Sequence, residues 1–168
     1  MKTFIQHTVL LVVLLIVQTG ICDPTFTAPS LPTDSQDKHL GNATCGSAFC
    51  HDAAQPWKTS AVMQNEFSQW KAHDPHAKAY NTLTSDAAKK IANNLNIATP
   101  EQEKRCLDCH ANNVSVEKRG RQFSITDGVS CEACHGGADR WLGVHVSGTG
   151  DHAQNIASGM YPTDKPQA

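Results

Sequence analysis

Large apolar and aromatic residues are scarce in this 168-residue chain, in which Phe, Trp and Tyr together make up 6% of the sequence. A domain of this length ordinarily buries more of them in its core. The formal net charge is only −2, so no strongly basic surface is predicted. The composition therefore gives no indication of nucleic-acid binding, and it suggests that the polypeptide alone lacks material for an ordinary core.

Long apolar runs are also missing, except for nine residues near the start, Val9–Val17. That run is too short for a membrane span, but it follows Lys2 and precedes the small residues Gly20 and Cys22. This pattern predicts a signal peptide over residues 1–22 and export to the periplasm or beyond the cell. Membrane association is expected only if Cys22 is lipidated, and residues 19–22 lack the small residue that a lipobox places directly before its cysteine.

Cleavage before Asp23 would leave residues 23–168, about one domain in length. Residues 23–40 are rich in Pro, Thr, Ser and Asp in their first part and are expected to form a flexible leader. Residues 41–168 are then expected to form the folded domain.

Six of the seven cysteines form three pairs, and a histidine directly follows each pair. The pairs are Cys45 and Cys50 before His51, Cys106 and Cys109 before His110, and Cys131 and Cys134 before His135. The last two are Cys-x-x-Cys-His motifs, the attachment signature of c-type haem. Two thiols reach the two vinyl groups of one porphyrin, and the adjoining histidine reaches the iron. The first pair is a stretched Cys-x4-Cys-His variant, so three covalent haem c groups are predicted.

Two interpretations without haem compete with this one. Three disulfides would suit an exported protein, but they do not explain a histidine after every pair. Cys106, Cys109, Cys131 and Cys134 also approach the spacing of a zinc ribbon. The export signal, the third pair and the repeated histidine all favour haem over zinc.

The remaining histidines are candidates for the sixth, distal positions of the three irons. His51, His110 and His135 are the expected proximal ligands, and the distal candidates are His39, His73, His76, His145 and His152. Met63 and Met160 are also available, but nine histidines against three methionines favour bis-histidine haems of low potential. His76 and His145 are preferred because each lies on a short predicted helix beside aromatic residues, which suits a haem face. His152 is a weaker candidate, and His39 and His73 are expected at the surface.

The pattern of apolar residues predicts helices and no sheet, because no period-two run is long enough for strands. Helices are expected over residues 75–83 after Asp74 and 86–95 after Ser85, from a Thr99 capping box through His110, and over 138–145. The expected fold class is mainly α, with short helices and long loops wrapped around stacked haems. The basic run 118–121 is expected to pair with haem propionates or to be solvated.

Several segments resemble the multihaem cytochromes related to cytochrome c-554. They are Ala43–His51, Trp70–Tyr80, Cys106–Ala111 and Asp127–His145 within a similar stretch of about residues 41–162. The type member is a tetrahaem carrier that accepts electrons from hydroxylamine oxidoreductase in ammonia oxidisers. The resemblance implies closely stacked, mostly bis-histidine haems, distal roles for His76 and His145, a weaker match at His152, and other cytochromes or redox proteins as partners.

One departure from these relatives concerns the end of the chain. Relatives commonly continue into a further haem motif, whereas this sequence stops at Ala168, six residues after Pro162. It is then either a natural three-haem protein or an incomplete reading frame. The leading hypothesis is an exported electron-transfer cytochrome. The alternative is a haem enzyme that reduces or oxidises nitrite, NO or hydroxylamine at an iron without a sixth protein ligand.

Overall fold

The computed structural model describes residues 31–148 and 150–163. The predicted signal peptide, Cys22 and the first residues of the predicted leader lie outside the described residues. The described part consists of short helices joined by long loops, which confirms the expected mainly α class. Its only pairing of the strand type is one isolated bridge between His39 and Arg119.

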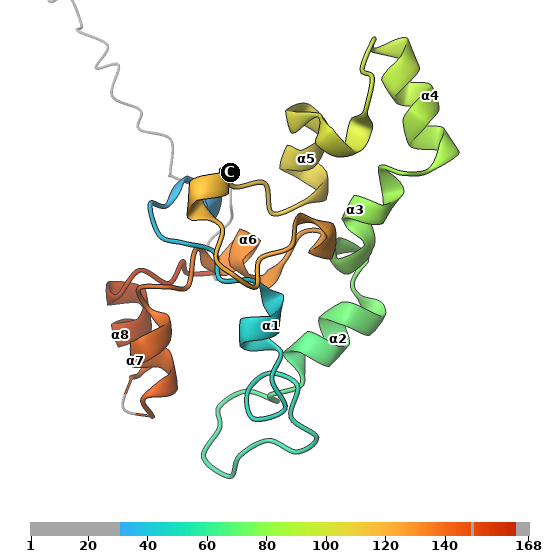
Figure 1. Ribbon diagram of the computed structural model, residues 1–168. Helices are drawn as coiled ribbons and strands as arrows, with labels where there is room; N and C mark the ends of the chain where they lie inside the picture. Colours follow the sequence, from blue (N-terminus) through green and yellow to red (C-terminus); the bar gives the residue numbers. More distant parts are fainter. Residues whose placement is uncertain (1–30, 149, 164–168) are drawn as a thin grey trace, which may run out of the picture.

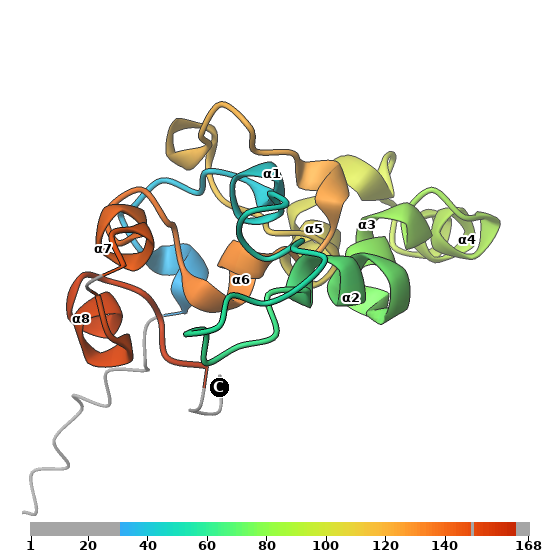
Figure 2. The same cartoon turned by 90° about the horizontal axis from the view of Figure 1, so that it is seen from below.

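The described residues contain short α-helices and short 3-10 turns. The α-helices are α1 (Asn42–Cys45), α2 (Glu66–His73), α3 (Ala79–Thr82), α4 (Asp86–Asn94), α5 (Lys104–His110), α6 (Cys131–His135), α7 (Leu142–Val146) and α8 (His152–Ala157). The 3-10 turns are η1 (Pro32–Asp34), η2 (Pro75–Lys78), η3 (Pro100–Gln102), η4 (Val116–Lys118) and η5 (Ile125–Asp127). α7 and α8 lie side by side at one end, α1 and α6 lie in the middle, and α4 lies at the other end (Figures 1 and 2).

Two of the predicted helix starts are confirmed. The Ser85 side chain accepts a hydrogen bond from the Ala88 N–H at 3.2 Å and caps α4. The Asp74 carboxylate accepts one from the His76 N–H at 2.9 Å and starts η2. These bonds satisfy backbone donors that the first turn of a helix cannot pair internally.

Two predicted helices are broken in the structure. Residues 75–83 divide into η2 and α3, because Lys78 leaves the helical region between them. The predicted cap at Thr99 is wrong, because its side chain makes no capping bond and Glu103, in an extended conformation, separates η3 from α5. The Glu103 side chain caps α5 instead. The second Cys-x-x-Cys-His motif therefore begins almost at the start of its own helix.

The apolar core of the described residues is small. Leu83, Leu107 and Ala111 form a buried cluster, and Tyr80 and Ile125 pack against it. This cluster joins α3 to α5 near the second motif. Of the nine buried apolar residues in the described part of the chain, four are alanine. These buried residues agree with the expectation, drawn from the composition, that the polypeptide core is small for a chain of this length.

The segment before α1 is held in the middle of the molecule. His39 exchanges backbone hydrogen bonds with the 118–120 segment, and Leu40 and Gly41 donate their N–H groups to the Glu132 carboxylate, each at 2.7 Å. His39 was expected at the surface, and this expectation is wrong, since its exposed fraction is 0%. Composition predicted a leader here, but hydrogen bonds to residues about 80 to 100 positions away fix it.

Within the described ranges, no helix has the length and apolar character needed to cross a membrane.

Candidate functional site

Helix α5 carries the second motif. Cys106 and Cys109 are three residues apart and so share one helix face, and His110 is the last helical residue. The Nδ1 atom of His110 lies 3.0 Å from the Ala79 carbonyl oxygen and 2.9 Å from the Thr82 hydroxyl. Because a carbonyl oxygen only accepts, Nδ1 carries the ring proton and donates it, which leaves Nε2 for a metal ion.

A cavity of about 380 Å³ opens beside this motif, between α4 and α5. It is lined by Thr82, Leu83, Ser85, Ala87, Ala88, Ile91, Ala92, Ile97, Pro100, Arg105, Cys106, Cys109 and His110. Both thiols and the imidazole of the motif thus meet one largely apolar space. This donor set and lining fit a porphyrin held by two thioethers and one imidazole. No second histidine and no methionine lines this cavity.

The first motif begins at Cys45, the last residue of α1, and continues through a loop. His51 folds back so that its N–H donates to the Cys45 carbonyl at 3.1 Å, which brings the stretched motif together. The Nδ1 atom of His51 lies 2.8 Å from the Glu66 Oε2 atom at the start of α2. Burial opposes ionisation of Glu66, but the hydrogen bond with His51 holds its pKa below the usual value. The Nδ1 atom therefore donates to a carboxylate, and Nε2 again remains for a metal.

His51 is paired with His145 of α7. The two imidazole rings are parallel within 7°, and their centres are 5.9 Å apart. The expected proximal ligand of the first motif and a predicted distal candidate thus lie together, so His51 and His145 would be the pair to hold one haem iron. Trp141 packs edge-on against His145, with ring centres 5.5 Å apart.

Asn155 of α8 holds the Nδ1 side of His145. Its Nδ2 atom lies 3.3 Å from the His145 Nδ1, while its buried Oδ1 has no partner among the described residues. A half-turn of the amide exchanges these two atoms and gives both of them a better environment, since the ring Nδ1 can then donate to the oxygen. The oxygen then accepts the Nδ1 proton, and the His145 Nε2 is free to bind a metal as in His51.

Helix α6 consists of the third motif, Cys131–His135. The His135 Nδ1 is buried and has no hydrogen-bond partner within the described part of the chain. Burial lowers the pKa of His135, and the nearby His51, His145 and His152 lower it further. The proximal histidines of the first and third motifs and the two candidates His145 and His152 thus gather in one region.

The first and third motifs also meet through their thiols. Cys45 and Cys131 are both half-buried and share a side-chain hydrogen bond. That bond raises the pKa of Cys45 and lowers the pKa of Cys131. Cofactors attached to these two cysteines would approach each other at this point, where α1 packs on α6.

The remaining distal candidates, His76, His73 and His152, are exposed. His76 lies in η2, exposed, and its Nδ1 is 2.9 Å from the Asp74 carboxylate. Its carbonyl accepts from the Val129 N–H at 3.0 Å, which places η2 just before the third motif. His73 is exposed at the end of α2, and His152 is exposed at the start of α8. No described contact pairs these three with a proximal histidine.

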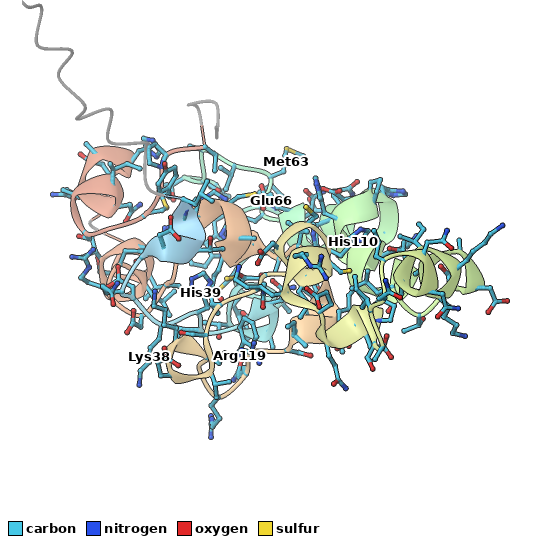
Figure 3. All side chains as sticks on the ribbon, turned by 90° about the horizontal axis from the view of Figure 1, so that it is seen from above. Lys38, His39, Met63, Glu66, His110 and Arg119 are labelled. Atoms are coloured by element: carbon cyan, nitrogen blue, oxygen red, sulfur yellow. The ribbon has the colours of Figure 1, made fainter. Side chains whose placement is uncertain are left out.

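The basic run 118–121 is engaged by the protein itself. Lys118 donates to the Asp34 carbonyl, and Arg119 donates to the Val114 carbonyl and packs on the Phe123 ring. Figure 3 shows Lys38, His39 and Arg119 near one another, toward an edge away from Met63 and Glu66.

Sequence reasoning missed Glu66, Asn155 and Glu132. Glu66 lies 15 residues from His51, and Asn155 lies ten from His145, so no short motif links either residue to its histidine. Only the folded chain brings them together. Glu132 occupies a variable position of the third motif, where the sequence gives no reason for a buried carboxylate.

The cysteines do not assemble the alternative zinc site. All six cysteines of the motifs are free, and no group of three or more Cys, His, Asp or Glu side chains in the described part could hold a metal ion. The four cysteines with ribbon-like spacing are therefore not gathered around one point. This arrangement favours two separate attachment motifs.

Comparison with known proteins gives one match. The sequence model of the family described as cytochrome c554 and c-prime matches residues 44–136. This stretch contains all three Cys-His motifs but ends before His145 and His152. Neither the curated proteins nor the solved structures gave a match to this chain.

Proposed function

Because the chain belongs to the cytochrome c554 and c-prime family, we propose that it is an exported electron-transfer protein with three haem c groups. Family membership makes it a c-type cytochrome with covalently bound haem. The number of haems, the ligands and the export are the parts that the proposal adds.

The proposed attachment residues are the cysteines of the three motifs: Cys45 with Cys50, Cys106 with Cys109, and Cys131 with Cys134. His51, His110 and His135 would bind the irons from the proximal side, and haem c would supply one-electron chemistry. The protein's own residues would fix the spacing of the three sites, orient the imidazoles and line the cavity between α4 and α5.

The observation that carries the proposal is the pairing of His51 with His145. Each ring faces a hydrogen-bond partner with Nδ1, Glu66 for one and Asn155 for the other. The two parallel rings stand 5.9 Å apart. A low-spin bis-histidine site at the first motif accounts for both features, and such a site suits electron transfer because neither axial position is open. The contact between Cys45 and Cys131 supports close placement of the first and third cofactors.

His76 and His152 are proposed as further distal ligands with weaker support. His152 lies near enough to His135 for its charge to lower the pKa of that ring. His76 lies beside the segment that leads into the third motif.

A second candidate function rests on the cavity at the second motif. His110 is the only histidine in its lining, and no methionine joins it. A haem at this place would keep one axial position open, as a site for small ligands such as NO, nitrite or hydroxylamine requires. Addition of CO to the reduced protein tests this, with one haem per chain that is high-spin before the addition and binds CO as the expected result. Multiple turnover of nitrite or hydroxylamine by the isolated protein would make the chain an enzyme.

Export and partners complete the proposal. A signal peptide over residues 1–22 would direct the chain to the periplasm or beyond the cell, where haem c is attached. Other redox proteins or cytochromes would donate and accept its electrons. Lipidation of Cys22 is the one route to a membrane that the sequence offers.

The decisive experiment is an intact-mass measurement on protein expressed with the haem-attachment machinery. The expected mass is that of residues 23–168 plus three haems, with a pyridine haemochrome assay giving the same number. A gain of two haems would show that the stretched first motif is unused. A gain of none would overturn the proposal.

A further inference from the structure

The three proximal histidines differ in what their Nδ1 atoms contact. The Nδ1 of His51 lies 2.8 Å from a carboxylate oxygen of Glu66. The Nδ1 of His110 contacts only neutral oxygens, those of Ala79 and Thr82. The Nδ1 of His135 is buried without any partner among the described residues. Three motifs with the same cysteine and histidine chemistry are thus supported in three different ways.

The partner of Nδ1 changes the donor strength of a metal-bound imidazole. A carboxylate pulls on the Nδ1 proton and gives the ring partial imidazolate character, which makes Nε2 a stronger donor. A stronger donor stabilises ferric iron more than ferrous iron and lowers the reduction potential. A neutral carbonyl has a smaller effect, and a ring without a partner has none.

The loop before α2 is built to hold Glu66 in place. The Glu66 Oε1 atom accepts a hydrogen bond from the Gln64 N–H at 3.1 Å, so its two oxygens are held by different groups. Gln64 is buried and has φ of 56°, in the left-handed region that side chains seldom adopt. Its side chain accepts from the Trp57 N–H at 2.6 Å, and its carbonyl accepts from the Ala53 N–H at 2.8 Å. This strained residue, which is hydrogen-bonded through its N–H, its carbonyl and its side-chain oxygen, fixes the position from which Glu66 reaches His51.

From this geometry we propose that Glu66 is a positioning residue that lowers the reduction potential of the haem at the first motif through its hydrogen bond to His51. The inference rests on the proposed function, in which His51 binds that haem. It adds a graded order of support, with a carboxylate at the first haem, neutral oxygens at the second and no partner at the third.

The test is a redox titration of Glu66→Gln. The amide keeps the size of the side chain but removes the charge that polarises the Nδ1 proton. The equilibrium constant for reduction of one haem is expected to rise about tenfold. This corresponds to a rise of about 59 mV in the potential of a one-electron couple. The other potentials should stay nearly unchanged.

Asp52→Asn is the matched control for loss of a nearby charge. Asp52 directly follows His51, but its carboxylate contacts the Ser68 hydroxyl and not the imidazole. Thr82→Val is the control for a neutral Nδ1 partner, because the Ala79 carbonyl remains available to His110. In both controls the equilibrium constant for reduction of any one haem is expected to change by less than about threefold. A Glu66→Gln shift no larger than the Asp52→Asn shift would overturn the inference.

A further variant covers the case in which Glu66→Gln loses its first haem. Glu66→Asp keeps the charge and the start of α2 but shortens the reach, so an intermediate rise in potential is expected. An unchanged potential in Glu66→Asp, with the haem retained, would equally count against the inference. Haem counts of all variants separate this result from failure of the proposed function, since a wild type without a haem at the first motif would fail before any potential is compared.

Discussion

At the scale of single residues, the histidines of this cytochrome differ in what surrounds each ring. His51, His110 and His145 have protein groups at Nδ1, which leaves Nε2 free to bind iron. The motif predicts which histidines are proximal, because they follow the cysteines directly. The proposed distal partner, His145, lies 94 positions away from His51, and only the folded chain brings the two rings together.

Replacement of His145 by Ala should convert one haem from low-spin to high-spin. The imidazole facing His51 would be lost, and the iron would have an open position for CO. Visible and EPR spectra before and after CO addition measure this change. His73→Ala is the matched control, since His73 is exposed and should leave the spectra unchanged. Low-spin spectra in the His145 variant would contradict the assignment.

His39 should make the stability of the protein depend on pH. Burial, followed by the charge of Lys118, lowers its pKa from 6.5 to about 4, although Asp37 and Asp139 oppose the shift. The unfolded chain therefore takes up a proton first on acidification, so stability falls as the pH drops from 6.5 to about 4. The total loss from this group is about 3 kcal/mol.

Denaturant unfolding at pH 7 and at pH 4.5 measures this loss. His39→Gln should show a smaller loss on acidification than the wild type, and His73→Gln should behave like the wild type. NMR titration of the His39 ring provides a check that needs no variant, with a midpoint near pH 4 expected. A midpoint close to 6.5 would show that the ring is not held neutral by burial.

At the scale of elements, the local sequence predicted where helices start better than where they break. Ser85 and Asp74 cap as expected because a cap depends on neighbours within one turn. The interruptions at Lys78 and Glu103 were not predicted. The backbone conformations at Lys78 and Glu103 are set by the packing of α3 and η3 against α5. The pattern of residues within one helix does not predict such packing.

Glu132 connects its own helix, α6, to the segment before α1 and to the loop after α6. Its carboxylate is buried and accepts the N–H groups of Leu40, Gly41 and Ala138 at 2.7 to 2.9 Å. Burial raises the pKa of Glu132, while these three donors lower it. The carboxylate thus ties the segment before α1 and the loop after α6 to the helix of the third motif.

Glu132→Gln should destabilise the protein by about 2 to 3 kcal/mol, because the amide nitrogen would face the Gly41 N–H and leave a buried donor unpaired. Denaturant unfolding followed by far-UV circular dichroism gives the difference in the free energy of unfolding. Faster hydrogen exchange at Leu40 and Gly41 should accompany it. Glu117→Gln, at an exposed position, is the control and should change stability by less than about 0.5 kcal/mol. Equal stabilities of the two variants would rule out this role for Glu132.

At the scale of the whole molecule, the described chain has few large side chains with which to hold itself together. Only five of its buried apolar residues are larger than alanine, namely Leu83, Ile97, Leu107, Val114 and Trp141. Phe49, Trp57 and Met63 are more than half exposed in the loop around the first motif. The composition predicted this shortage, but it could not show that large apolar side chains are left exposed in the loop around the first motif.

The chain without haem should therefore fail to form a cooperative native state. Burial of apolar area supplies most of the free energy of folding, and three porphyrins would replace the missing core. Expression of residues 23–168 in the cytoplasm, without haem attachment, should give protein with weak near-UV circular dichroism, ANS binding and no sharp thermal transition. The haem-loaded protein, prepared from the exported form, is the control and should unfold in one cooperative step. A haem-free chain with a sharp transition and protected amides at Leu83 and Leu107 would mean that the polypeptide alone forms the core.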